Sequence, residues 1–190
     1  LLYRLSGQKE IACSIIDSGR EHPSLHGVIG FFINSLIFKS AVVEDEPFLD
    51  FLQRTGRDVL EIFQHRGYPL ELVFEGLNMK YPEISASFNL LNMQDNSLRD
   101  QLTEFSPLHT DNYGEAKFVM EPYLSEFKNG IEMHWVYKKR VFKAETMAYI
   151  ANAYIKTLEE ILQNPSLPVN QYRIFPAPDA ANINDVNGNR

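Results

Sequence analysis

The sequence predicts an α/β fold, and three observations lead to that prediction. Residues 28–38 are almost entirely apolar, which is the composition of a strand buried on both faces of a sheet. Residues 147–162 carry apolar side chains at helical spacing. Residues 117–127 and 131–137 flank Asn129-Gly130, a strong signal for a β-hairpin. A chain of 190 residues with these elements is long enough for one domain, or for a large piece of a bigger one.

The first elements are short. Residues 1–5 are typical of the last turn of a helix that we expect to begin before Leu1, with Ser6-Gly7 supplying the usual glycine at a helix C-terminus. Residues 11–16 form a mostly apolar run that predicts a buried strand, and the turn residues 17–20 follow it. A loop then leads into the strand predicted over 28–38.

Two helices are expected next. Pro47 follows an acidic stretch and opens an amphipathic pattern that continues to about Arg66, because acidic residues and proline are favoured in the first turn of a helix. Gly67 ends this helix. Pro69 then opens a shorter helix that ends near Gly76.

The second half continues the alternation. Residues 85–93 predict a strand with Ala86, Phe88 and Leu90 on one face. Residues 94–114 have no sustained period and predict a long loop, and a loop of that length favours the cover of a site. In the last helix the apolar stripe comprises Met147, Ile150, Ala151, Tyr154, Leu158, Ile161 and Leu162.

Composition excludes several classes of protein. The formal net charge of −7 and the isoelectric point near 5.2 argue against a nucleic-acid binder, which needs clustered Lys and Arg. Cys13 is the single cysteine, so the chain has no internal disulfide and no cysteine-rich zinc site, which fits a reducing cytoplasm. No apolar run approaches the ~20 residues of a membrane-spanning helix. Pro23 and Gly27 argue against a helical metal pair made by His22 and His26.

Asn34 is the polar residue that the predicted strand has to accommodate. An amide left without partners in a buried strand costs roughly 1–3 kcal/mol, so its side chain must bond to backbone, to water or to a ligand. The residues alone leave open whether Asn34 is a satisfied core residue or part of a site. Gly30 favours a site, because a glycine within a strand often marks the close approach of a ligand or of another backbone.

Several stretches resemble the condensation domain of nonribosomal peptide synthetases. Gly19-Arg20 precedes Val28-Ile29-Gly30-Phe31-Phe32-Ile33-Asn34-Ser35-Leu36, which is similar to the family's Gly-x-Phe-Val-Asn-Thr strand. His65-Arg66-Gly67-Tyr68-Pro69-Leu70-Glu71 is similar to its His-Gln-Asp-x-Pro-Phe-Glu stretch. The resemblance extends through 88–94 and 116–118 and covers residues 1 to about 168. Ser35, Lys39 and Val119 depart from the family's usual Thr, Arg and Asp, and the Arg-Asp-x-Ser-rich segment expected after Gly76 is not recognisable.

The resemblance implies a chloramphenicol acetyltransferase-like architecture, in which two lobes, each a mixed β-sheet flanked by helices, meet at a V-shaped cleft. Residues 1–168 would then be the C-terminal lobe of such a domain, and residues 169–190 a linker or tail. The family's His-His-x-x-x-Asp-Gly motif does not occur in the 190 residues. The resemblance places this motif in an N-terminal lobe upstream of Leu1, so no catalytic residue is expected in this chain.

The implied activity is amide bond formation between acyl or aminoacyl thioesters. The two groups would arrive on the phosphopantetheine arms of donor and acceptor carrier proteins, through opposite mouths of a tunnel. The expected partners are the N-terminal lobe, these carriers and a downstream adenylation domain, with no cofactor or metal bound directly. Gly30, Phe32 and Asn34 would line or brace the tunnel, whereas the motif residues Arg20, His65, Pro69 and Glu71 would be structural.

Two alternatives stay open at this point. The chain could belong to a noncatalytic condensation-like module that recruits other proteins, or to a relative that takes acyl groups from free coenzyme A. An upstream His-His-x-x-x-Asp-Gly motif would favour catalysis, and its loss would favour recruitment. The residues do not distinguish condensation from epimerisation or cyclisation.

Overall fold

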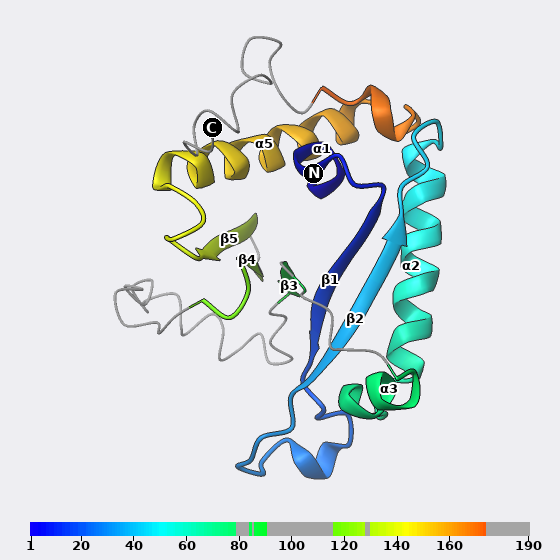
Figure 1. Cartoon of the computed structure of the whole chain (residues 1–190), viewed down its shortest axis with the longest axis vertical. Helices are drawn as coiled ribbons and strands as arrows, with labels where there is room; N and C mark the ends of the chain where they lie inside the picture. The colour runs from blue at the N-terminus through cyan, green and yellow to red at the C-terminus, as the bar shows by residue number, and fades with distance from the viewer. Residues whose placement is uncertain (79–83, 85, 91–115, 128–129, 174–190) are drawn as a thin grey trace.

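The computed structural model describes residues 1–78, 84, 86–90, 116–127 and 130–173. Its centre is a five-stranded sheet in the order β2-β1-β3-β4-β5 (Figure 1). Strands β1 (Glu10–Asp17) and β2 (Asn34–Ala41) are antiparallel, as are β4 (Met120–Phe127) and β5 (Gly130–Tyr137). The short β3 (Ser87–Leu90) pairs in parallel with both β1 and β4. The mixed sheet expected for an α/β fold is therefore confirmed.

Among the described residues, four helices accompany the sheet. They are α1 (Leu2–Ser6), α2 (Phe48–Gln64), α3 (Leu70–Gly76) and α5 (Ala144–Gln163), with 3₁₀ turns η1 (Pro23–Leu25) and η4 (Val169–Gln171). Gly7 ends α1 in the left-handed conformation, with φ of 70°. Pro47 and Pro69 immediately precede α2 and α3, as their start signals predict.

The helices are arranged around one face and one edge of the sheet. In Figure 1, α2 runs beside β2 and α5 crosses the upper end of the sheet. The apolar core joins side chains from β2, β4, α5, the residue before β3 and the segments after β2 and α5; it comprises Leu36, Val42, Ala86, Leu124, Met147, Ile150, Ala153 and Tyr172. This packing places the C-terminal helix over the sheet, as its amphipathic pattern indicates.

In β3 the predicted face is found, whereas in α5 the buried residues differ from the prediction. The buried residues of β3 are Ser87 and Asn89, whereas Phe88 and Leu90 are 37% and 53% exposed. Ala86, Phe88 and Leu90 lie on one face, as the sequence pattern predicts, and all three line a cavity. In α5, Leu158 and Leu162 belong to the predicted stripe yet are exposed, because the buried line runs through Thr146, Met147, Ile150, Ala153 and Thr157.

The predicted strand over 28–38 is wrong in its first half. Strand β2 begins only at Asn34, and the residues before it form a loop in which Ile29 is fully exposed and Phe31 is 87% exposed. The apolar composition of this segment does not reflect burial within the described residues. Its conformation is instead held by side chains from the preceding turn, as set out below.

The predicted tail also starts too early. Tyr172 is 3% exposed, its ring lies 5.9 Å edge-on from that of Phe48, and its hydroxyl donates to the Asn164 carbonyl at 2.6 Å. The amide of Val169 donates to the Glu46 carbonyl at 3.0 Å. The packed region therefore continues to Arg173, and the rest of the predicted tail, 174–190, lies outside the described residues.

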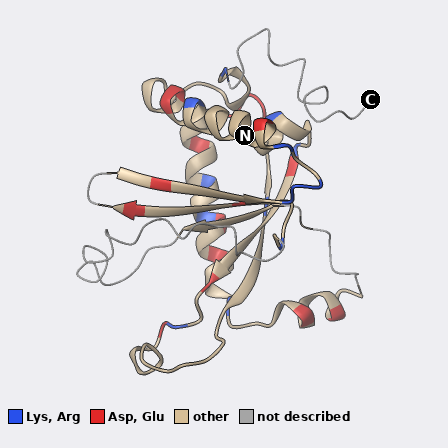
Figure 2. Cartoon of the chain, turned by 90° about the vertical axis from the view of Figure 1, so that its left-hand side faces the viewer, with Lys and Arg blue, Asp and Glu red and all other residues tan. Residues whose placement is uncertain are grey.

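Two further expectations concern connections. The loop predicted over 94–114 lies outside the described residues. The β4–β5 ladder closes with the pair Phe127–Gly130, so Gly130 belongs to β5, while residues 128 and 129 are again outside the described part. Basic and acidic residues are interspersed along α2 (Figure 2). Of the helices that the structure describes, none is long and apolar enough to cross a membrane.

Candidate functional site

Arg20 organises the segment before β2. Its guanidinium donates hydrogen bonds to the carbonyls of Leu25, Val28 and Gly30, at 2.5, 2.7 and 3.1 Å. The same group lies 4.4 Å from the centroid of the Phe32 ring, which is cation–π distance. One side chain thus satisfies three main-chain acceptors and one aromatic face. These contacts support a structural role for Arg20.

Two glycines allow this loop to close on itself. Gly19 has φ of +64°, and a Cβ built there would lie 2.1 Å from the Phe32 carbonyl oxygen. A Cβ at Gly30 would lie 2.9 Å from the Phe32 ring. The Phe32 main chain therefore excludes a side chain at Gly19, whereas a side chain at Gly30 would require the Phe32 ring to shift.

Asn34 joins this loop to the end of α2. Its Nδ2 donates to the Arg66 carbonyl at 2.7 Å, and the side chain is half-buried. The Arg66 guanidinium forms an ion pair with Glu21 and lies 5.9 Å from the Phe63 ring. The sequence left open whether the Asn34 side chain bonds to backbone, to water or to a ligand, and in the structure it bonds to the backbone carbonyl of Arg66. The segments around Arg20 and His65, far apart in sequence, are thereby fixed to each other.

The remaining motif residues shape the turn between α2 and α3. The His65 amide donates to the Ile62 carbonyl and the His65 carbonyl accepts from the Tyr68 amide, both at 3.0 Å. Pro69 occupies the N-cap of α3, and Glu71 lies in its first turn, where a carboxylate is favoured by the helix dipole. Their side chains are exposed. The positions of these residues support structural roles.

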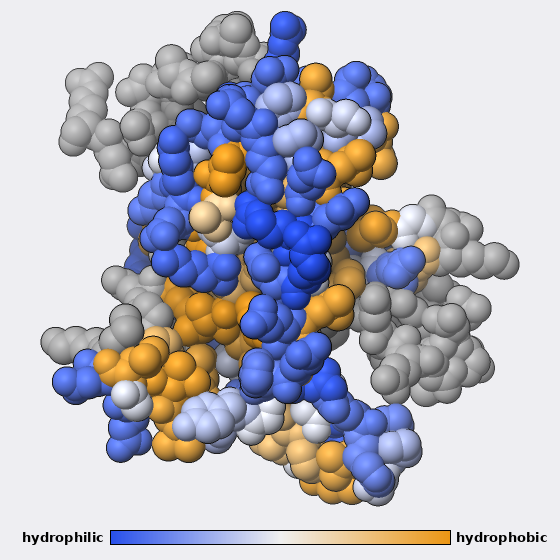
Figure 3. All heavy atoms as spheres, turned by 90° about the vertical axis from the view of Figure 1, so that its right-hand side faces the viewer, coloured by the Kyte–Doolittle hydropathy of each residue, from blue (hydrophilic) through white to orange (hydrophobic). Residues whose placement is uncertain are grey.

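Hydrophobic side chains gather on the surface near these motifs. Viewed from the side of α2, Figure 3 shows hydrophobic residues on the lower part of the molecule, where α3 and the loop before β2 lie. Those exposed by a third or more of their surface are Val28, Ile29, Phe31, Ile33, Leu72, Val73 and Leu77. A groove of about 830 Å³ runs between β2, α2 and α3, with Lys39, Asp58, Glu61 and His65 among its lining residues.

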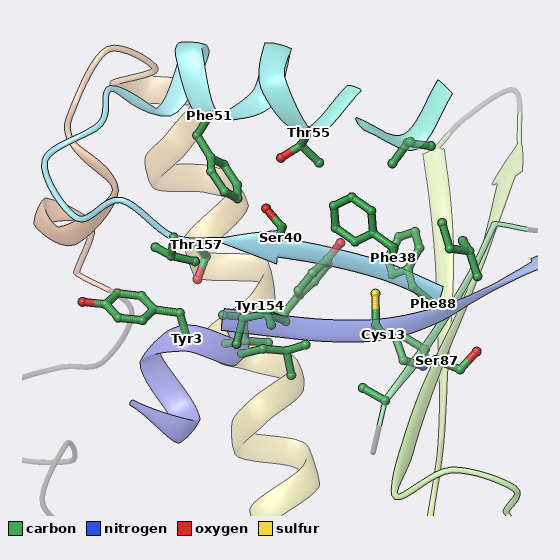
Figure 4. Close-up of a pocket in the computed structure, with 18 of the residues that line it drawn as sticks. Tyr3, Cys13, Phe38, Ser40, Phe51, Thr55, Ser87, Phe88, Tyr154 and Thr157 are labelled. Carbon is green, nitrogen blue, oxygen red and sulfur yellow. The ribbon is translucent and has the colours of Figure 1, made fainter. Parts of the chain in front are cut away.

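A second cavity, of about 680 Å³, lies between the sheet, α2 and α5 (Figure 4). Its walls are mostly apolar, and the Ser40 and Thr55 hydroxyls have no hydrogen-bond partner. Burial raises the pKa of the Cys13 thiol, which lines this cavity, to about 11. A thiol with such a pKa is protonated at neutral pH and is a poor nucleophile. The cavity therefore has no group suited to covalent catalysis at that position.

The described residues contain no group of three His, Cys, Asp or Glu side chains placed to hold a metal ion. The two histidines considered above bond within their own loop. His22 Nδ1 lies 2.7 Å from the Ser24 hydroxyl, and His26 Nε2 lies 3.1 Å from the Arg20 carbonyl. Both rings thus help to build the loop that Arg20 organises.

Sequence reasoning missed a set of buried polar residues on the central strands. Ser14, Ser87, Asn89 and Glu121 are between 1% and 5% exposed. The available signal was the presence of small polar residues in otherwise apolar strands. Their clustering could not be read, because it depends on the parallel pairing of β3 with β1 and β4.

Curated relatives are large synthetases, of which this chain matches a small part. Surfactin synthase subunit 1 of Bacillus subtilis (strain 168) is 29% identical over 186 residues, covering 95% of this chain and 5% of the relative. Gramicidin S synthase 2 of Brevibacillus brevis is 27% identical over 195 residues, covering 99% of this chain and 4% of the relative. The chain thus spans about a twentieth of the length of these relatives.

Solved structures with the same fold include a four-domain nonribosomal peptide synthetase bound to AMP and glycine, with TM-score 0.81, 15% identity and coverage of 93% of this chain and 15% of that one. For the X-domain in complex with OxyB from teicoplanin biosynthesis, the TM-score is 0.75 and the identity 19%, and the match covers 92% of this chain and 40% of that one. For the first condensation domain of the CDA synthetase, the TM-score is 0.69 and the identity 14%, and the match covers 92% of this chain and 40% of that one. The likeness confirms the fold expected from the sequence.

The family model that matches is the condensation domain, over residues 1–183. This match includes the motif segments around Arg20, Asn34 and His65, which the structure joins into one unit. It covers nearly the whole chain, and the curated synthetases and the solved structures agree with it. The chain therefore belongs to the condensation domain family.

Proposed function

We propose that this chain is the C-terminal lobe of a condensation domain that forms amide bonds between carrier-bound thioesters. The proposal is supported by the extent of the match to the first condensation domain of the CDA synthetase, where 92% of this chain corresponds to 40% of that one. A chain of this size leaves room in the domain for a second lobe. The second lobe would carry the His-His-x-x-x-Asp-Gly motif.

The observation that carries the proposal is the joining of the two motif segments. Arg20 fixes the main chain at Gly30 and the ring of Phe32, and Asn34 bonds to the Arg66 carbonyl. In the proposed domain this unit braces the tunnel wall beside Gly30, Phe32 and Asn34. A rigid wall orients the reacting arms, and orientation lowers the barrier of a bimolecular step.

The proposed reaction defines the partners. A donor carrier and an acceptor carrier each present a phosphopantetheine arm, so the arm is part of the substrate and not a resident cofactor. The acceptor amine attacks the donor thioester carbonyl, a C–N bond forms, the C–S bond breaks, and the thiol leaves with a proton. The N-terminal lobe completes the site, a downstream adenylation domain loads the acceptor, and the protein works in the cytoplasm.

The test compares the intact two-lobed domain with residues 1–190 alone. Both are mixed with donor and acceptor carrier proteins loaded with their own amino acids, and the dipeptidyl carrier is measured by mass spectrometry. We expect product from the intact domain and none from the fragment. Product from the fragment would contradict the placement of catalysis in the other lobe, and no product from the intact domain would contradict amide formation.

A second candidate is recruitment of another protein without catalysis. It is supported by the likeness to the X-domain, which was solved in complex with OxyB, and by the exposed Ile29 and Phe31 side chains. The same assay separates the two functions, since a recruitment module forms no dipeptide. Loss of partner binding on Phe31→Asp, with Leu60→Asp on the exposed side of α2 as the control, would then favour recruitment.

A further inference from the structure

Five basic residues gather around the turn between β5 and α5. Two segments supply them, because the Lys138 amide donates to the Val119 carbonyl at 3.1 Å and so joins the turn to the segment that contains Lys117. Figure 2 shows the turn as a blue segment between the end of β5 and the start of α5. The five residues, which together form the basic turn, are Lys117, Lys138, Lys139, Arg140 and Lys143.

Backbone hydrogen bonds hold the basic turn in one conformation. The Val141 and Phe142 amides donate to the Lys138 carbonyl, at 2.8 and 3.1 Å. Lys143 occupies the N-cap of α5, so the turn is also attached to a helix of 20 residues. All members of the basic turn except the half-buried Lys138 are exposed. Their charges are therefore presented to solvent from a fixed position on the sheet and the helix.

The positive charge of the basic turn is not neutralised by its neighbours. None of its five residues forms an ion pair with another described residue. The Glu121 carboxylate, close in sequence, is buried and accepts hydrogen bonds from the Phe118 amide and the Tyr123 hydroxyl instead. The exposed Glu145, in the first turn of α5, offsets one of the five charges. In a chain of net charge −7 the basic turn is thus a local excess of positive charge, which attracts anionic partners.

The basic turn lies at the end of the sheet where the C-terminal segment is fixed. β5 ends at Tyr137, which pairs with Met120 at the start of β4, and β4 runs parallel to β1 through β3. The same end of the sheet carries the end of β2, and the segment after β2 accepts hydrogen bonds from the Val169 and Asn170 amides, both at 3.0 Å. In the proposed synthetase the downstream adenylation domain and the acceptor carrier follow this C-terminal segment.

We propose that the basic turn attracts and orients the acceptor carrier protein through an anionic surface of that carrier. This inference rests on the proposed function and names the surface of the lobe that one of its partners meets. Every loaded carrier bears a phosphodiester anion where the phosphopantetheine arm is attached, so negative charge accompanies the substrate. The carrier has to bind and leave in each turnover. Charge attraction suits such a partner, because it raises the association rate more than it strengthens the complex.

The test measures association of each loaded carrier with the intact two-lobed domain by stopped-flow fluorescence, and the main variant combines Lys139→Glu with Arg140→Glu. At about 0.1 M salt we expect the association rate constant of the acceptor carrier to fall roughly tenfold, with that of the donor carrier unchanged. The difference should disappear at about 1 M salt, where the Debye length shrinks from about 10 Å to about 3 Å. Lys139→Gln with Arg140→Gln should give a smaller fall. Single-turnover amide formation at saturating carrier and the melting temperature should not change, because both side chains are exposed.

Lys156→Glu combined with Arg173→Glu is a matched control. It makes the same change in net charge at two exposed residues, of which Lys156 lies in the second half of α5 and Arg173 beyond the end of that helix. Its association rates should equal those of the unmodified domain. Equal acceptor rates for the two charge-reversed variants, or a loss confined to the donor carrier, would overturn the inference while leaving the proposed function intact. An unmodified domain that forms no amide would overturn both.

Discussion

Replacement of Gly19 by alanine should disrupt the loop that carries Gly30 and Phe32. At φ of +64° an L-residue costs roughly 1–2 kcal/mol more than glycine. The added Cβ would also lie 2.1 Å from the Phe32 carbonyl oxygen, a main-chain atom that no rotamer change can move. Displacing Phe32 weakens its cation–π contact with Arg20, which contributes about 0.5–1 kcal/mol. We expect a total loss of about 2 kcal/mol or more in the free energy of unfolding.

The measurement is urea denaturation of the intact domain, with Gly27→Ala as the control. Nothing lies within 4 Å of a Cβ built at Gly27, and its φ is not in the left-handed region, so alanine should be tolerated there. Amide formation by the folded fraction should fall only in the Gly19 variant. A difference between the two variants below about 0.5 kcal/mol would refute the argument that Gly19 is required by the position of Phe32.

Three further predictions concern other contacts. Asn34→Ala should cost about 1 kcal/mol, since the Arg66 carbonyl loses its donor, and should slow single-turnover condensation; a large drop in melting temperature with unchanged turnover would contradict the tunnel assignment. Tyr172→Ala should cost about 3 kcal/mol in denaturation, and a loss below 1 kcal/mol would restore the earlier boundary of the tail. The hydrogen bonds from Arg54 lower the pKa of Glu46, so Glu46→Gln should destabilise by about 0.5–1 kcal/mol at pH 7. This loss should shrink as the pH falls through the native-state pKa of Glu46, and an effect that does not change with pH would exclude this ion pair.

Local signals in the sequence were sufficient for most of the elements. Pro47, Pro69 and Gly7 mark helix boundaries through the conformations that proline and glycine favour, and the structure has helices at these places. The β4–β5 hairpin and the amphipathic α5 also follow from patterns within single segments. Such signals depend on residues close in sequence, so a single chain is enough to read them.

The site depends on contacts between distant residues, which composition does not encode. Residues 28–33 are apolar enough for a buried strand, yet Arg20 holds their carbonyls in a loop and leaves Ile29 exposed. The reverse holds for Asn89, a polar residue that is buried because β3 lies between β1 and β4. The first case depends on hydrogen bonds between residues eight to ten positions apart, and the second on the pairing of strands tens of residues apart.

The place of β3 in the sheet has a consequence for folding kinetics. The β1–β2 and β4–β5 hairpins each connect strands close in sequence, and hairpins form in about 1–10 μs. β3 joins them through two residue pairs on each side, Ser14–Ser87 and Ile15–Phe88 toward β1, and Asn89–Tyr123 and Leu90–Leu124 toward β4.

At a synthesis rate of roughly 5–20 residues per second, several seconds pass between completion of the β1–β2 hairpin and synthesis of β3. A further interval of seconds passes before β4 is synthesised. Through these intervals the inner edges of β1 and then β3 are open to pairing with other chains. The joining of the two hairpins at β3 should therefore limit the folding rate. Substitutions in the four residues of β3, Ser87–Leu90, should slow folding more than they speed unfolding.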